Sequence, residues 1–398
     1  MTADPTLAPN PALLEWGRIE GGFPLDRVAR SLGVKEERVI AWERGSRAPT
    51  VRQIENLARL LHRPLSLFFL PVPPALEPLA AEYRRLPGVE VGHESPELRL
   101  AIRQMLARRE NALNLMGELG IDPPPFNHAA RLSEAPEAVA GRLRVALGVK
   151  VTQQAAFSDG WEAWNAWRSA AEELGVLVFQ FPKVTLNEVR GLVFPRAPLP
   201  VVALNSKETV PEARAYTLIH ELLHLMLFNA NEESTALRDR RPDAEWSRIE
   251  RFVEIAASHA LVPEDWLERE LATQSSGTQQ WTVPLIRSLA RRFRITPSAV
   301  AARLRSSRRM SVQAYEAWRD EWDHYVATLG PARSGPSSPA QKTLGRSGRP
   351  FTQLVLQALG SNRITSVDAA RYLDLRYHHF DELRERLVAR RRDASGDE

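Results

Sequence analysis

The sequence contains no cysteine, which restricts both its redox chemistry and the ligands that it can offer to a metal. A chain without cysteine forms no disulfide and has no thiolate, so any metal site must use histidine, aspartate or glutamate side chains. The absence also fits a reducing compartment, and we expect a cytoplasmic protein.

Long apolar runs are missing as well. No stretch approaches the roughly 18 consecutive apolar residues that span a bilayer, and the first residues lack the basic and apolar regions of a signal peptide. The 398 residues are 43% hydrophobic and 26% charged, a balance typical of soluble globular proteins. We therefore expect two or three domains with sizeable cores, and no membrane partner.

Acidic residues are absent from one long segment, although the net charge of the whole chain is only +4. Between Ile286 and Met310 the sequence carries eight arginines and no acid, within two predicted helices, the second capped by Thr296 and opened by Pro297. Such a segment either forms a solvated helix face or binds phosphate groups, and the lack of carboxylates favours DNA, double- or single-stranded. The predicted DNA contacts are Arg287, Arg291, Arg292, Arg294, Arg303 and Arg305.

The spacing of apolar residues in 11–70 predicts a compact group of short helices near the start of the chain. Apolar residues recur at helical intervals in 25–32, Gly33 supplies a turn, and Thr50 is the predicted N-cap of a later helix. This order predicts a helix-turn-helix domain, whose second helix presents its early residues to DNA bases. The candidate DNA contacts are Lys35, Arg38 and Arg44. Two adjacent glutamates accompany them and would repel DNA phosphates, so the domain either binds specific DNA or serves protein contact, including homodimer formation.

Three short runs rich in β-branched and aromatic residues follow a helical stretch. They cover 175–182, 189–195 and 199–205, are broken by Gly and Pro, and predict a small sheet in an otherwise helical chain. The expected fold class is therefore mainly α with a small β-sheet (α+β). The strand over 201–205 is the predicted edge to which an extended substrate segment could add.

The run from Ala215 to Phe228, AYTLIHELLHLMLF, places two histidines four residues apart with a glutamate between them. On an α-helix this spacing puts His220 and His224 about 40° apart on one face, so both imidazoles can bind one cation. Glu221 beside them can act as a general base toward water. The alternative is a core helix that tolerates two histidines, but the surrounding leucines imply burial, which is costly for these groups unless they are paired or bound to a metal.

A third ligand should be a carboxylate on a following helix, since the third-histidine positions of the extended motif hold Leu227 and Ala230. Glu250 is the predicted ligand, and Glu254, four residues on, either orients a histidine or is a surface acid. Tyr216, one turn before the first histidine, either stabilises an oxyanion or packs at the sheet edge. The expected ion is Zn²⁺, and Mn²⁺ fits the same ligands.

These segments together resemble the ImmA/IrrE family of zinc metallopeptidases. The resemblance rests on GVLVFQF, RGLVF, PVVALNS, ARAYTLIHELLHLML and RIERFVEIAASHALVP. The family's third ligand is a glutamate shortly before an L-x-P ending, which maps onto Glu250. The sequence departs from the family at Leu223, where glycine is frequent, and at Glu254, where Asn or Asp is usual. The preceding WERGSRAPT and RPLSLFFLP resemble an XRE-type helix-turn-helix domain.

The resemblance implies a zinc-dependent endopeptidase that regulates transcription, in response to stress, by cutting a helix-turn-helix repressor or antitoxin-like partner. The alternative is a DNA-binding regulator without proteolysis, in which zinc is structural or sensory, but an intact Glu221 argues against it. The expected domains are an XRE-type domain (11–70), a helical connector (71–170), a metallopeptidase core (171–275), a basic helix-turn-helix-like segment (276–330), a linker (331–350) and a C-terminal helical module (351–390).

Overall fold

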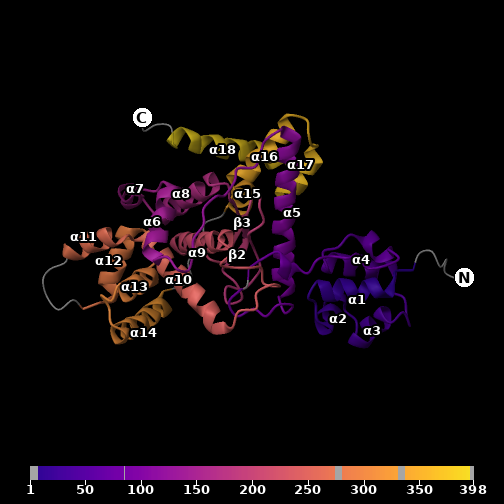
Figure 1. Cartoon of the computed structure of the whole chain (residues 1–398). Helices are drawn as coiled ribbons and strands as arrows, with labels where there is room; N and C mark the ends of the chain where they lie inside the picture. The colour runs from indigo at the N-terminus through magenta and orange to yellow at the C-terminus, as the bar shows by residue number, and fades with distance from the viewer. Residues whose placement is uncertain (1–7, 85, 274–279, 330–336, 395–398) are drawn as a thin grey trace, which may run out of the picture.

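The chain is mainly helical and contains one three-stranded sheet, as the sequence predicts (Figure 1). The computed structural model describes residues 8–84, 86–273, 280–329 and 337–394. Within these ranges no helix is long and apolar enough to cross a membrane.

Four short helices form a first domain with its own core at one end of the molecule (Figure 1). The predicted helix-turn-helix consists of α2, a turn at Gly33 and α3. Gly33 has a φ of 65°, a left-handed conformation that glycine adopts without strain, so the chain can turn sharply there. Thr50 is the N-cap of α4, as predicted, and it also forms a capping box with Gln53. The bounds are α1 Pro11–Glu20, α2 Leu25–Leu32, α3 Glu36–Glu43 and α4 Val51–Leu60.

The sheet has the strand order β1-β3-β2. Strands β1 (Leu177–Phe181), β2 (Gly191–Phe194) and β3 (Val201–Asn205) lie within the three predicted runs. Strand β3 pairs in parallel with β1 and antiparallel with β2, so both of its sides are occupied. The prediction that β3 is an edge strand is therefore wrong, because the parallel pairing with β1 is a long-range contact that no local pattern indicates. The edges of the sheet are β1 and β2.

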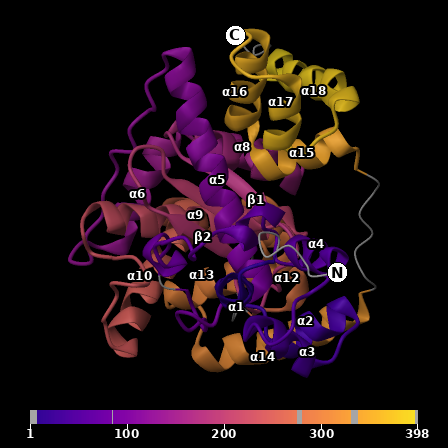
Figure 2. The same ribbon diagram turned by 90° about the vertical axis from the view of Figure 1, so that its right-hand side faces the viewer.

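Side chains alternate across the sheet and contribute to two separate cores. Val178 and Val202 belong to the core that contains α8 (Gly160–Glu173) and α9 (Pro211–Asn229). The opposite face is covered by α5 (Pro96–Leu119), which crosses the sheet in Figure 2. Helix α9, which carries the H-E-x-x-H motif, is thus held between the sheet and α10 (Asp243–Leu261).

The C-terminal helices pack beside α5 over the same face of the sheet (Figure 2). The rings of Phe179 in β1 and Phe351 in α16 meet edge to face, with centroids 5.6 Å apart. Residues 331–336 of the predicted linker lie outside the described residues. The later part of that segment is not a linker, because Pro339–Ser347 form helix α15, which packs against β1. The bounds are α15 Pro339–Ser347, α16 Arg349–Gly360, α17 Ser366–Leu373 and α18 Phe380–Ala394.

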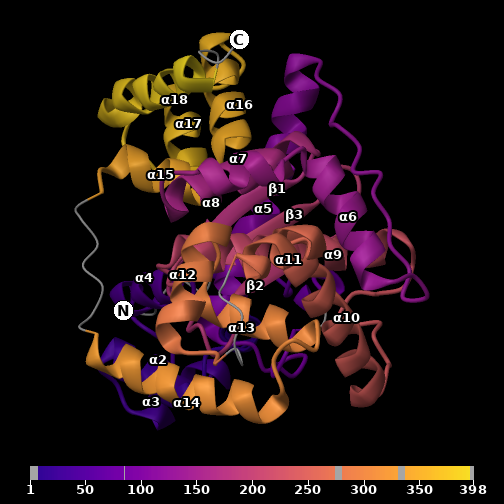
Figure 3. The same cartoon turned by 90° about the vertical axis from the view of Figure 1, so that its left-hand side faces the viewer.

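Helices α12, α13 and α14 lie on the side of α9 away from the C-terminal helices (Figure 3). Helices α12 and α13 have the predicted helix-turn-helix order, with Thr296 as the N-cap of α13. Ile286 and Phe293 lie in the same core as α9, so the basic segment packs as part of this domain. The bounds are α6 Pro136–Leu147, α7 Val151–Ala156, α11 Glu264–Ala272, α12 Val283–Phe293, α13 Pro297–Ser306 and α14 Val312–Thr328.

Candidate metal centre

Helix α9 brings the two histidines of the motif to one point. Their Nε2 atoms lie 3.1 Å apart, as expected for side chains one turn apart on the same face. His224 is buried, whereas the side chain of His220 is 14% exposed. The pair therefore lies at the boundary between the core and a position that solvent can reach.

Glu250 reaches the same point from α10. Its two carboxylate oxygens lie 3.4 Å from the Nε2 atoms of His220 and His224, and one donor atom of each residue lies within 4.8 Å of the others. Two imidazole nitrogens and a carboxylate are the donor set of catalytic zinc sites, which keep a fourth position for water or substrate. The residues therefore fit a divalent metal ion.

Glu233, and not Glu254, orients a histidine. An Oε2 atom of Glu233 accepts a hydrogen bond from Nδ1 of His224 at 2.8 Å, and both residues are buried. Nδ1 of His220 has no hydrogen-bond partner among the described residues, and Glu254 lies exposed on α10, so Glu254 orients neither ring. Glu233 follows the end of α9 in an irregular turn, where no periodic pattern marks it, so the sequence carries no signal for this contact.

The charge state of His224 follows from its neighbours. Burial and the Arg84 charge lower its pKa, but the Glu233 carboxylate and hydrogen bonds to Glu233 and Glu250 outweigh them and raise the pKa to about 9. A metal binds only the deprotonated imidazole, so metal binding at this cluster must release a proton at neutral pH.

Glu221, the predicted general base, is buried against β2. A Cβ atom at Gly191 would lie 2.6 Å from Oε1 of Glu221, so glycine is required where the strand passes the carboxylate. Burial raises the pKa of Glu221, but the charges of Arg84 and the two histidines lower it by more. The pKa therefore lies below its ordinary value, and the carboxylate is ionised.

Arg84, like Glu233, is a residue of this centre that no motif predicted. Its Nε and Nη2 atoms donate to the two oxygens of Glu221 at 3.1 and 3.2 Å, and its Nη1 donates to Glu250 at 3.2 Å. Arg84 lies in the connector, far from α9 in the sequence, and the surrounding EYRRL gives no spacing that indicates a role.

Tyr216 lies one turn before His220, with the two ring centroids 6.3 Å apart. Its ring packs against the core around α9. Burial, and then the charges of Glu254 and Glu250, raise its pKa, so the hydroxyl stays protonated and can donate a hydrogen bond. The position is compatible with either predicted role, packing or oxyanion stabilisation.

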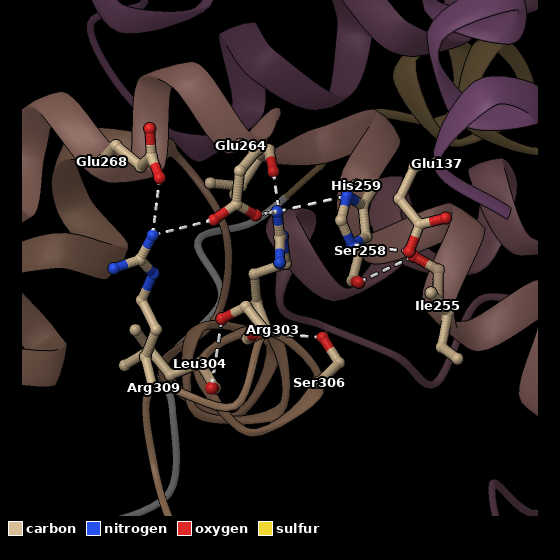
Figure 4. A network of polar contacts seen from close by, with 12 residues as sticks. Glu137, Ile255, Ser258, His259, Glu264, Glu268, Arg303, Leu304, Ser306 and Arg309 are labelled. Carbon is tan, nitrogen blue, oxygen red and sulfur yellow. Dashed lines mark hydrogen bonds and ion pairs between the residues drawn. The ribbon is translucent and has the colours of Figure 1, made fainter. Parts of the chain in front are cut away.

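One predicted DNA contact, Arg303, lies in the interior (Figure 4). Its guanidinium donates to the Val262 carbonyl at 3.0 Å and to Glu264 at 2.6 Å, and it lies 3.2 Å from Nδ1 of His259. The prediction that Arg303 binds DNA is therefore wrong, because the side chain ties α13 to the end of α10 and to α11. His259 accordingly belongs to this network and not to the His220–His224–Glu250 cluster.

The acids that compensate the basic segment come from α11, outside the arginine-rich stretch. Glu270 pairs with Arg292, and Glu264 and Glu268 pair with Arg309. Two other arginines lie over aromatic rings of α14: Arg287 is 4.7 Å from the ring centre of Tyr325, and Arg305 has the same distance to Tyr315. The exposed members of the predicted set are Arg287, Arg291, Arg292 and Arg305, and Arg294 is half-buried at the end of α12.

In the first domain, the predicted DNA contacts lie around α3. Lys35 and Arg44 are exposed and Arg38 is half-buried, next to the exposed Glu36 and Glu37. The inward side of α3 carries Val39 and Trp42, which belong to the domain core. The helix thus presents a mixed-charge outer face.

Two family models match separate parts of the chain. Residues 171–305 match the IrrE N-terminal-like domain of the Peptidase_M78 family, and residues 14–68 match a helix-turn-helix family. The first match includes the sheet, the H-E-x-x-H helix, Glu250 and most of the basic segment. No curated protein matches the chain.

Proposed function

The chain is an ImmA/IrrE-type protein with an N-terminal helix-turn-helix domain, and from this premise we propose that it is a zinc-dependent endopeptidase that regulates transcription. The observation that carries the proposal is the convergence of His220, His224 and Glu250 beside the buried Glu221. A structural metal site needs no general base, whereas peptide hydrolysis does.

Each residue of the centre has a distinct role in this proposal. His220, His224 and Glu250 hold the ion. A bound zinc or manganese ion supplies Lewis-acid chemistry, since it polarises a peptide carbonyl and lowers the pKa of water. Glu221 takes a proton from the attacking water and delivers it to the leaving amine. The Tyr216 hydroxyl donates a hydrogen bond to the oxyanion that develops on the carbonyl.

The substrate in this proposal is a DNA-binding repressor or an antitoxin-like protein that is cut at one site. The support is the presence of a helix-turn-helix domain and a peptidase-like domain on one chain. The outer face of α3 and the exposed arginines of α12 and α13 bring the enzyme to DNA, so binding should weaken steeply with salt.

A second function, DNA-binding regulation without proteolysis, is favoured by one observation. Both oxygens of Glu221 accept hydrogen bonds from Arg84, so in this conformation the carboxylate is engaged by a cation and is a weaker base. In that function the metal is structural or sensory.

The two functions are separated by a cleavage assay read by intact mass. The wild-type protein and Glu221→Gln are incubated with repressors encoded beside the gene, with and without zinc and with and without single- or double-stranded DNA. A discrete cut that requires both zinc and Glu221 supports the endopeptidase. Tight DNA binding by both proteins with no cut under any condition supports the regulator.

A further inference from the structure

The connector segment 79–84 meets the outer edge of β2 at its last residue. The amide of Arg84 donates to the carbonyl of Val193 in β2 at 3.4 Å. On the other side of the segment, the loop 235–237 donates hydrogen bonds of 2.7 and 2.8 Å to its carbonyls and forms an antiparallel bridge with Arg84. The segment therefore occupies the sheet edge next to the H-E-x-x-H helix, where an extended substrate would pair by strand addition.

The side chain of Arg84 extends from this segment into the metal centre. Its guanidinium forms a two-point contact with Glu221 and a third hydrogen bond to Glu250 at 3.2 Å. Arg84 is only 3% exposed, as is Glu221, so the contacts are shielded from water. Bidentate arginine–carboxylate contacts are among the strongest that side chains form, and they are stronger still when buried.

We propose that residues 79–84 form an internal latch that keeps the centre inactive, an inference that rests on the proposed function. The latch covers the β2 edge at Val193 and occupies both oxygens of the general base with one guanidinium. A carboxylate in this state has its charge compensated and part of its lone pairs occupied, so it is a weaker base toward water. Release of the segment exposes both the β2 edge and Glu221 at once, so one movement switches substrate binding and catalysis together.

The latch is also tied to the helix-turn-helix domain. The Tyr83 hydroxyl donates to Glu94, and Glu94 forms an ion pair with Arg99 at 3.1 Å. Arg99 in turn donates to the carbonyls of Ile19 and Glu20 at the end of α1, at 3.0 and 3.1 Å. Binding of DNA or of a repressor to the first domain can therefore act on Arg84 through the three linked contacts of Tyr83, Glu94 and Arg99.

The test compares Arg84→Ala and Arg84→Lys with the wild type and with Arg190→Ala, a control whose exposed arginine precedes β2 and pairs with Glu208 outside the centre. Lysine keeps the charge but cannot form the two-point contact, which also covers the case in which the alanine variant fails to fold. With zinc and a repressor but no DNA, both Arg84 variants should cut faster than the wild type. The increase for Arg84→Ala should be about tenfold or more, because a charge-assisted hydrogen bond contributes more free energy than a tenfold change in rate corresponds to. Arg190→Ala should behave as the wild type.

Two readouts that do not require cleavage accompany this assay. Hydrogen exchange should become faster in 79–84 and at residues 236 and 237, whose amides bond to the segment. A peptide hydroxamate should bind the zinc-loaded Arg84 variants more tightly than the wild type, since its chain needs the β2 edge.

The outcomes distinguish the latch from the proposed function. If folded, zinc-loaded Arg84 variants cut more slowly than the wild type, Arg84 assists the reaction and the latch is wrong. If no protein cuts any repressor, the endopeptidase proposal fails, and the latch is judged by exchange and hydroxamate binding alone. Faster exchange with tighter binding then supports it, and values equal to those of the wild type overturn it.

Discussion

Glu233 holds Nδ1 of His224 at 2.8 Å, and this contact leaves Nε2 of the same ring directed at His220 and Glu250. Because the carboxylate accepts the Nδ1 proton, Nε2 is the nitrogen that binds a metal. A carboxylate in this position fixes the ring and raises the basicity of the ligand. The metal centre therefore includes a residue beyond the H-E-x-x-H motif and its glutamate partner.

Replacing Glu233 by glutamine should weaken zinc binding about 10- to 100-fold, since the amide can still accept the hydrogen bond but no longer carries the charge. Competition with a chelator measures the change, and Glu232→Gln, at the half-exposed neighbouring position, is the matched control. An unchanged zinc affinity in Glu233→Gln would show that the contact does not support the ligand.

Glu94 should make stability depend on pH. Burial raises its pKa, but hydrogen bonds from Tyr83 and Gly92 and the charge of Arg99 lower it below the ordinary value of 4.5. A carboxyl whose folded pKa is lowered contributes stability that is present above the unfolded pKa and lost as pH falls through the folded pKa. Glu94→Gln should therefore lower the free energy of unfolding by about 1–3 kcal/mol at pH 7, with a smaller difference below pH 4.5. Urea unfolding at both pH values measures this, and a difference that grows on acidification contradicts the assignment.

Arg303 and Arg287 should respond in opposite ways to substitution. Arg303→Met should reduce stability by about 1–3 kcal/mol, because it removes the hydrogen bonds of a buried guanidinium to the Val262 carbonyl and to Glu264, while Arg309 still pairs with Glu264. Arg287→Ala should leave stability nearly unchanged, weaken DNA binding and reduce the salt dependence by about one phosphate contact. Thermal unfolding and fluorescence anisotropy at two salt concentrations separate the effects. Weaker DNA binding by a fully stable Arg303→Met would show that its buried position was misassigned.

Asn205 fixes the loop that joins β1 to β2. Its amide donates to the carbonyls of Val184 and Val189 at 3.1 and 2.9 Å, and its oxygen accepts from the amide of Lys207 at 3.0 Å. Asn205→Asp keeps the shape but turns the donor into an acceptor that faces two carbonyls, so unfolding free energy should fall by about 2–4 kcal/mol. Asn187→Asp, exposed on the same loop, should have little effect in the same urea titration. Equal stability of the two variants would contradict this role.

Features encoded in neighbouring residues were predictable from the sequence. The predicted N-caps Thr50 and Thr296 depend only on the cap residue and the few residues that follow it, and both cap helices in the structure. The approach of His220 to His224 follows from the helical repeat alone. The three β-rich runs also became strands, because their composition and turn residues are local.

Features that depend on long-range contacts were not predictable in the same way. The parallel pairing of β1 with β3, which removes β3 from the edge, joins strands separated by a third one in the sequence. Glu264 and Glu270 neutralise arginines that the charge pattern alone left unpaired. Arg84 reaches Glu221 from 137 positions earlier in the chain, and no periodicity connects them.

The central claim is that His220, His224 and Glu250 hold a metal with which Glu221 hydrolyses a protein. Its most direct test measures bound zinc and repressor cleavage in the same samples. The samples are the wild type and Arg84→Ala as parents, and each parent with Glu221→Gln or with Glu250→Gln. Glu221→Gln should retain its zinc while the rate falls by about 10²- to 10⁴-fold, and Glu250→Gln should lose both zinc and cleavage. Cleavage by zinc-loaded Glu221→Gln at the rate of its parent would contradict the account.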